Sequence, residues 1–127
     1  MTEPADPRQT KVLSVGQCGF DGPAIKRALK GEFGCLVVDA ESVDEAAGVL
    51  DTQDFDLVLV NRVFDATGEE GVELMRRTDT AKTPVMMVSN YPEAHDAAEQ
   101  AGGVRGFGKN DMGGPAMMDA VRPYLAK

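Results

Sequence analysis

Short, mostly apolar runs recur along the chain, separated by longer segments of mixed polarity. They lie at Val12–Val15, Cys35–Val38, Leu57–Val60, Val85–Val88 and, more weakly, Val104–Phe107. Runs that are apolar at consecutive rather than alternate positions are typical of strands covered on both faces, as in parallel sheets. The pattern therefore predicts five parallel strands.

The segments between these runs carry apolar residues at helical spacing. The clearest helix is predicted over 43–50, with Ser42 as its N-cap and Glu45 completing a capping box. In the segment after the first run, Asp21 is the expected N-cap and Pro23 falls in the first turn. The other apolar stripes are Ile25, Ala28 and Leu29; Val72 and Met75; Ala94, Ala97, Ala98 and Ala101; and Met117, Ala120, Val121, Tyr124 and Leu125.

Strand and helix thus alternate five times. Right-handed crossovers then give an α/β fold of the flavodoxin-like (βα)5 type, a three-layer sandwich whose parallel sheet has the strand order 2-1-3-4-5. We expect this domain to cover residues 11–127 and a disordered tail to cover residues 1–10. Ligands and partners of such sheets meet the carboxyl ends of the strands, so function is expected in the loops there.

Composition narrows the classes of partner. The 127 residues include 13 Lys and Arg against 21 Asp and Glu, a net charge of −8, which repels nucleic acid and anionic membrane surfaces. No apolar stretch approaches the roughly 20 residues that span a bilayer, and the N-terminus does not read as a signal peptide. Two cysteines cannot make a disulfide framework. We therefore expect a cytoplasmic protein that binds neither nucleic acid nor membrane.

Four segments, in this order and spacing, resemble the receiver domains of bacterial two-component response regulators. They are Phe55–Val60, Gly71–Leu74, Thr83–Ser89 and Gly106–Lys109, and the resemblance extends over nearly all of residues 11–127. In that family an aspartate at the end of the third strand accepts a phosphoryl group. Two acidic residues after the first strand hold Mg²⁺ with it, a Ser or Thr ends the fourth strand, and a Lys ends the fifth.

Matched position by position, the resemblance places Ser89 at the hydroxyl position and Lys109 at the lysine position. Asn61 takes the place of the acceptor aspartate, and Gly16 and Gln17 take the places of the acidic pair. An amide is neither charged nor usefully nucleophilic, and Mg²⁺ is held by carboxylates and phosphate oxygens. The resemblance therefore implies a degenerate receiver with no catalytic residue, no metal site, weak or absent Mg²⁺ binding, no other cofactor, and a Lys109 without a carboxylate partner.

Further departures concern the switching apparatus of the family. Phe107, the candidate switch aromatic, lies two residues before Lys109 rather than the usual three, and Asn110 stands where the family usually has a proline. The segment between Asn61 and Gly71 is also longer than the family pattern. Ordinary phosphorylation-driven switching is therefore not expected.

Three functional hypotheses follow. The leading one is a stand-alone, phosphorylation-independent receiver-like domain that acts through protein–protein interaction and has no enzymatic turnover. The alternative is a domain that senses a small anion or nucleotide at the end of the sheet near Ser89 and Lys109. The third is residual phosphotransfer through Asp65, which lies four residues beyond Asn61 but lacks an acidic shell for the metal.

The loop after the first strand contains a glycine pattern that is only a weak dinucleotide signal. Gly16, Gly19 and Gly22 have the spacing G-x-x-G-x-x-G, and Asp39 ends the second predicted strand, whereas the dinucleotide fingerprint is G-x-G-x-x-G. We therefore do not expect a dinucleotide cofactor.

The cysteines and the histidine have ordinary interpretations. Cys18 is expected to be a small loop residue and Cys35 a buried hydrophobic residue, too far apart for a disulfide. His95 is expected on the surface rather than as a metal ligand.

The last helix carries the candidate contact surface. In each methionine pair, Met86–Met87 and Met117–Met118, we expect one member to face outward. By resemblance to the partner and dimer surface of receivers, Met118, Arg122 and Tyr124 are candidates to bind a protein partner or a second copy of the chain.

Overall fold

The computed structural model describes residues 9–126, and residues 1–8 of the expected tail lie outside the described residues. Strands and helices alternate as predicted. In chain order they are β1 (Lys11–Val15), α1 (Asp21–Phe33), β2 (Leu36–Ala40), α2 (Val43–Thr52), β3 (Leu57–Asn61), α3 (Gly71–Arg77), β4 (Val85–Val88), α4 (Pro92–Gln100), β5 (Val104–Phe107), the 3₁₀ turn η1 (Lys109–Asp111) and α5 (Pro115–Leu125).

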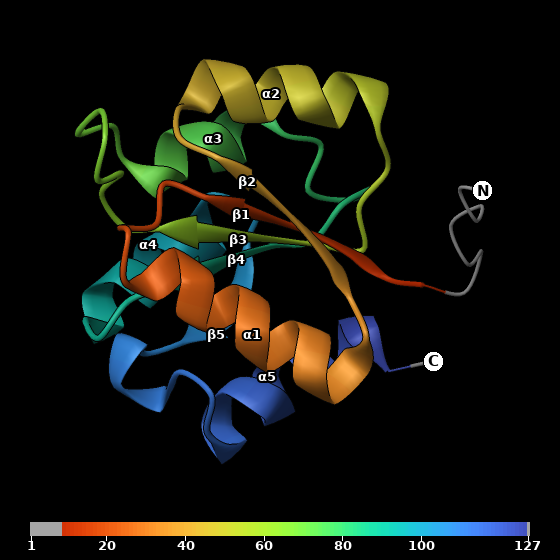
Figure 1. Cartoon of the computed structure of the whole chain (residues 1–127). Helices are drawn as coiled ribbons and strands as arrows, with labels where there is room; N and C mark the ends of the chain where they lie inside the picture. The colour runs from red at the N-terminus through yellow and green to blue at the C-terminus, as the bar shows by residue number, and fades with distance from the viewer. Residues whose placement is uncertain (1–8, 127) are drawn as a thin grey trace.

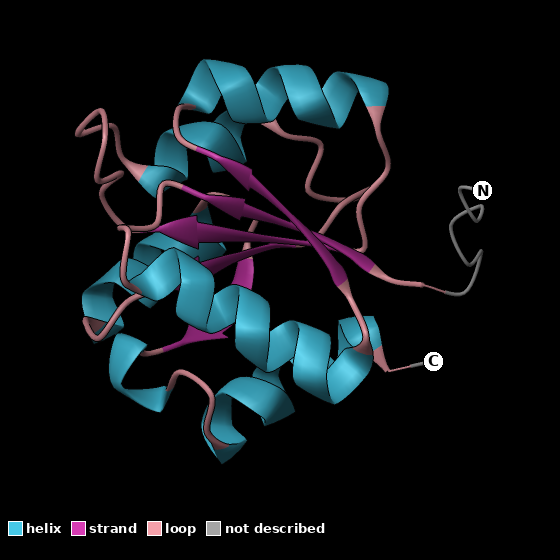
Figure 2. Cartoon of the chain, in the orientation of Figure 1, coloured by secondary structure: helices cyan, strands magenta, loops and turns pink. Residues whose placement is uncertain are grey.

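The five strands form one parallel sheet in the order β2-β1-β3-β4-β5, as predicted. Helices lie above and below this sheet, giving three layers (Figure 1). The arrowheads of β1, β2 and β3 point the same way, so their carboxyl ends meet at one edge of the molecule (Figure 2). The flavodoxin-like fold is therefore confirmed.

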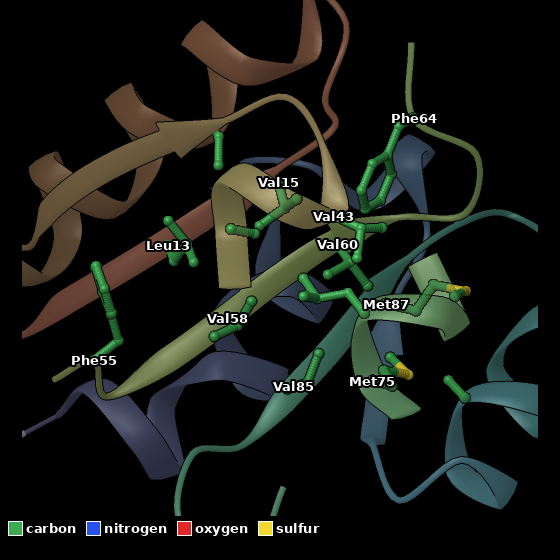
Figure 3. Close-up of a cluster of buried hydrophobic side chains, with 14 of the residues drawn as sticks. Leu13, Val15, Val43, Phe55, Val58, Val60, Phe64, Met75, Val85 and Met87 are labelled. Atoms are coloured by element: carbon green, nitrogen blue, oxygen red, sulfur yellow. The ribbon is translucent and has the colours of Figure 1, made fainter. Parts of the chain in front are cut away.

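The sheet is buried on both faces. One face packs against α1 and α5, in a cluster that includes Leu29 of α1 and Met117 of α5. The other packs against α2, α3 and α4, and Figure 3 shows part of that cluster, with Phe64 at its edge. Because successive strand residues point to opposite faces, Met86 and Met87 are both buried. The expectation that one of them faces outward is wrong.

Two residues of the expected tail, Gln9 and Thr10, contact the folded domain. Thr10 is buried, and its Oγ1 lies 3.1 Å from the Sγ atom of Cys35. The Gln9 side chain donates a hydrogen bond to the Gly34 carbonyl at 3.2 Å. Polar residues at the end of an otherwise polar segment give no sequence signal for such long-range contacts.

Of the two helix N-caps predicted from the sequence, that of α2 is confirmed and that of α1 is wrong. The Ser42 hydroxyl accepts a hydrogen bond from the Glu45 backbone N–H at 3.0 Å, so the predicted cap of α2 is confirmed. The Glu45 carboxylate reaches back to the Glu41 N–H at 2.9 Å. Asp21 is the first residue of α1 rather than its N-cap, and Phe20 occupies the cap position without a side-chain hydrogen bond. Within residues 9–126, none of the helices is long and apolar enough to cross a membrane.

Candidate functional site

Asn61 ends β3 at the carboxyl edge of the sheet and is 5% exposed. Its Nδ2 atom donates a hydrogen bond to the Gly16 carbonyl at 3.0 Å, and the same carbonyl accepts a second bond from the Asp65 backbone N–H at 3.0 Å. A carboxylate could not make the first bond because it has no proton to donate. The amide therefore fixes the loop after β1 to the end of β3.

Gly16 occupies a conformation and a space that only glycine fits. Its φ is +73°, in the left-handed region, and a Cβ atom there would overlap the ring of Phe64. Phe64 is 1% exposed and belongs to the core cluster. The ring of Phe64 thus fills the place where the family resemblance expects an acidic side chain.

The segment between β3 and α3 is folded so that it presents Phe64 to Gly16. The Phe64 N–H donates to the Glu69 carbonyl at 2.7 Å, and the Gly68 N–H donates to the Phe64 carbonyl at 2.8 Å. Val63 and Glu70 form an antiparallel bridge that closes the loop. Phe64 was not among the predicted site residues, although a large apolar residue in a mostly polar loop is a signal that could have pointed to it.

Gln17 occupies the second position of the expected acidic pair and offers little to a cation. Its Nε2 lies 3.4 Å from the Val15 carbonyl and 3.5 Å from the Leu59 carbonyl, while its Oε1 is buried without a hydrogen-bond partner. Among the residues the structure describes, no group of three or more His, Cys, Asp or Glu side chains could hold a metal ion. Positions 16 and 17 therefore offer no carboxylate to a Mg²⁺ ion.

Lys109 has a carboxylate partner, contrary to expectation. Its Nζ lies 3.2 Å from Oδ2 of Asp21, and the two side chains are 34% and 17% exposed. Asp21 was expected to cap α1, but as the first helical residue it directs its carboxylate to the end of β5 instead. The spacing of 88 positions between the partners gives no local sequence signal for this pair.

The Ser89 side chain forms a hydrogen bond within the turn between β4 and α4. Ser89 is 3% exposed, and its hydroxyl accepts a hydrogen bond from the Tyr91 backbone N–H at 3.1 Å. The Ser89 carbonyl lies 2.8 Å from Nε2 of His95, and since a carbonyl only accepts, Nε2 carries the proton. His95 is buried, so the expectation that it lies on the surface is wrong. Its helical position faces the sheet, alongside Ala94 and Ala98.

Asn61, Ser89 and Lys109 do come together around one pocket of about 340 Å³ at the carboxyl edge. Asp65 also lines this pocket, and its side chain is exposed. Arg62 forms part of the wall, with its guanidinium 5.0 Å from the centre of the Tyr91 ring. The pocket carries two basic groups and one acidic one, but Asp21 already neutralises Lys109. The predicted positions are therefore assembled, without an acceptor carboxylate at the end of β3.

Phe107 packs in the core on the face covered by α1 and α5. It is 4% exposed, whereas α4 lies against the opposite face of the sheet. The pairing of β5 with β4 shifts register before Phe107, and a Cβ atom on Gly106 would overlap the Met87 carbonyl. This irregularity sets which face Phe107 meets, and its role as a switch aromatic stays a prediction.

The three candidate contact residues of α5 do not share one flank of the helix. The Arg122 guanidinium lies 5.8 Å from the centre of the Phe33 ring of α1, and Met118 is one turn away on the same flank. Tyr124, two positions later, is rotated by about 200° and packs against the core cluster. Met117 is buried and Met118 half-buried, as expected for this pair. The proposed contact surface would therefore divide between the two sides of α5.

Both cysteines are free. Cys35 is buried as expected, and this burial raises the pKa of its thiol above the ordinary value; the nearby Asp56 carboxylate also raises it, whereas the hydrogen bond with Thr10 lowers it. Cys18 is half-buried, and its Sγ accepts a hydrogen bond from the Asp21 N–H at 3.3 Å.

Comparison with solved structures identifies the fold more closely. A protein described as a response regulator from Chloroflexus aurantiacus is 20% identical with a TM-score of 0.79, over 94% of this chain and 99% of that one. A chemotaxis response regulator of Vibrio cholerae is 17% identical with a TM-score of 0.72, over 92% of this chain and 99% of that one. A response regulator from Burkholderia pseudomallei is 16% identical with a TM-score of 0.72, over 94% of this chain and 68% of that one. That protein was solved with a phosphorylated aspartic acid and a calcium ion.

No protein-family model and no curated protein sequence matches the chain. The structural likeness therefore shows the fold, that of response regulator receiver domains, at a level of sequence identity too low to carry over activity.

Proposed function

We propose that this chain, which has the fold of response regulator receiver domains, is a phosphorylation-independent receiver-like module that signals by binding another protein. The observation that carries the proposal is the packing of the Phe64 ring on Gly16. That contact fills the place of a metal-binding acid, next to an Asn61 side chain already bonded to the Gly16 carbonyl.

Aspartyl phosphorylation needs a carboxylate nucleophile and a divalent cation that neutralises the transferred phosphoryl group. Asn61 supplies no nucleophile, and Gly16 and Gln17 supply no carboxylate to hold the cation. The chemistry of the donor set thus favours a module without phosphoryl transfer or other enzymatic turnover. Signalling would then depend on binding alone.

Phosphotransfer through Asp65 is a weaker proposal. The Asp65 backbone is tied to the Gly16 carbonyl, and its exposed side chain lies outside any metal-holding group of the described chain. Without a cation, the negative charge of the attacking carboxylate would oppose that of the phosphoryl donor.

Small-anion or nucleotide sensing near Ser89 and Lys109 is also less well supported. The Lys109 ammonium is paired with Asp21, and the Ser89 hydroxyl accepts a bond from Tyr91 N–H. An anion would have to compete with the Asp21 carboxylate for the lysine, at a site that also contains Asp65.

The direct test is incubation with acetyl phosphate and MgCl₂, followed by intact-mass measurement under conditions that preserve acyl phosphates. We expect an unmodified mass. A stoichiometric phosphate adduct would overturn the proposal, and its loss in Asp65→Asn would assign it to the third hypothesis.

A matched set of variants tests the role of Phe64. The triple variant Gly16→Asp, Gln17→Asp, Asn61→Asp restores the acids but still has the ring in their space, so we expect no adduct. Adding Phe64→Ala removes the overlap and should permit Mg²⁺-dependent phosphorylation. Circular dichroism confirms that each variant is folded, and an adduct on the triple variant would contradict the assignment of Phe64.

A further inference from the structure

A second pocket lies beside the loop between β1 and α1 and adjoins the one around Ser89 and Lys109, with which it shares Cys18 and Asp65. It has a volume of about 340 Å³ and is bounded by that loop, the first turns of α1, the end of β2 and the loop after β3. In Figure 1 these elements meet on the side where the strands end. Its volume is at the lower end of the range for small-molecule sites.

Two buried polar atoms at this pocket have no hydrogen-bond partner. They are Oγ of Ser14, a residue that is 1% exposed, and Oε1 of Gln17. Both residues line the pocket. Ser14 lies two residues after Val12 in β1, so both side chains are on the face covered by α1, whereas that of Leu13 is on the opposite face. A buried polar atom without a partner is costly, and a bound molecule here would supply the missing bonds.

The charges around the pocket select the kind of molecule. Its lining includes the carboxylates of Asp39, Glu41 and Asp65 and only one basic side chain, Lys26. Nζ of Lys26 lies 2.8 Å from Oδ2 of Asp39, which leaves Oδ1 of that carboxylate to accept further bonds. Because acceptors outnumber donors and the excess charge is negative, the pocket favours a ligand that donates hydrogen bonds and disfavours an anionic one such as a phosphate.

From these features we propose that the pocket binds the neighbouring hydroxyl groups of a small neutral sugar or nucleoside. The Asp39 carboxylate and Gln17 Oε1 would accept hydrogen bonds from the ligand hydroxyls. Ser14 Oγ would form its missing hydrogen bond with one of the same hydroxyls. Gly22, where α1 passes the pocket, has no side chain to fill it. The proposed ligand would not contact Ser89 or Lys109, and this proposal does not rest on the proposed signalling function.

The test is a titration of the ¹⁵N-labelled full chain, followed by amide chemical shifts, with four probes at up to about 10 mM. The probes are ribose, adenosine, AMP and 2′,3′-dideoxyadenosine. We expect saturable shifts at Gly16–Gly22 and Asp39–Glu41 with adenosine, ribose or both, which distinguishes a nucleoside from a free sugar. AMP should bind at least several-fold more weakly than adenosine, and the dideoxy compound should not bind.

Two variants and one control complete the design. Ser14→Ala and Asp39→Asn should each weaken the affinity for the binding probe by about tenfold, the loss expected for one hydrogen bond. Asp44→Asn, which removes the same charge from an ion pair with Arg77 on α2 and α3, should leave it unchanged. Absence of saturable shifts with ribose and adenosine, shifts confined to Ser89 and Lys109, or equal binding of the dideoxy compound would each overturn the proposal.

Discussion

Gly16 and Phe64 show how one contact can decide the chemistry of a site. A glycine with positive φ is often a simple turn residue, and Gly34, at the end of α1, is such a case, with φ of +66° and no atom within 4 Å of the place where a Cβ would lie. Gly16 has both the positive φ and an aromatic ring against it. The two glycines therefore separate the cost of backbone conformation from the cost of steric overlap.

Gly16→Ala should lower the free energy of unfolding by about 2–5 kcal/mol, since a left-handed alanine costs about 1–2 kcal/mol and overpacking adds about 1–3. Gly34→Ala should lower the free energy of unfolding only by the conformational cost of about 1–2 kcal/mol. Chemical denaturation measures both. In a Phe64→Ala background, Gly16→Ala should lose its overpacking cost, and additive effects of the two substitutions would contradict the contact.

The buried thiol of Cys35 predicts an alkaline loss of stability. Its pKa is raised in the folded state, so the folded protein retains this proton at pH values where the unfolded chain releases it. The stabilisation is complete below the ordinary pKa of about 9.0 and is lost as pH rises through the folded value. Urea unfolding from pH 7 to pH 10.5 should show a steeper decline for the native protein than for Cys35→Ala.

Cys18→Ala is the matched control for this experiment, because it removes the half-buried thiol. It should follow the pH dependence of the native protein. Parallel curves for the native protein and Cys35→Ala would show that the Cys35 thiol contributes nothing to this dependence.

At the scale of elements, the sequence pattern identified each strand and each main helix. The reason is local: apolar runs buried on both faces and stripes at helical spacing follow from the pleat and the pitch of the backbone. The capping box of α2 lies within four residues and was predicted in the same way. The start of α1 was not, since Asp21 is its first helical residue and pairs with Lys109, which is remote in sequence.

The cap of α2 can be tested against an uncapped helix. Ser42→Ala removes the hydroxyl that accepts from Glu45 N–H and should cost about 1 kcal/mol. Glu70, at the N-cap of α3, makes no side-chain cap bond, so Glu70→Ala should change stability by less than about 0.5 kcal/mol. Thermal and chemical unfolding of both variants measure the contrast, and equal losses would argue against the cap.

For the whole molecule, the fold was predictable and much of the site was not. The positions of Asn61, Ser89 and Lys109 followed from their places at strand ends, which the strand order brings to one edge. The rest of the site depends on contacts between segments far apart in sequence, namely Phe64 on Gly16 and Asp21 with Lys109. It also depends on the inward orientation of His95 in α4. No local periodicity encodes them, so they required the three-dimensional arrangement.

The proposed independence of Mg²⁺ can be tested on the complete domain. The thermal midpoint of the full chain should be the same, within about 1 °C, in 10 mM MgCl₂ and in EDTA. A ligand present at 100 times its Kd would add about 2.7 kcal/mol and raise the midpoint of a domain of this size by several degrees. Differential scanning calorimetry at matched ionic strength makes the comparison, and a rise specific to Mg²⁺ would contradict the proposed loss of the metal site.

The ring of Phe64 also bears on whether the ancestry implied by the resemblance could be reversed. An aspartate introduced alone at position 61 would lose its bond to the Gly16 carbonyl, and an acid introduced alone at position 16 would collide with the ring. Each first step backward would therefore lower stability without restoring chemistry. Selection acting on one substitution at a time would meet a loss of stability at the first step, so such a departure from phosphate signalling would be difficult to reverse.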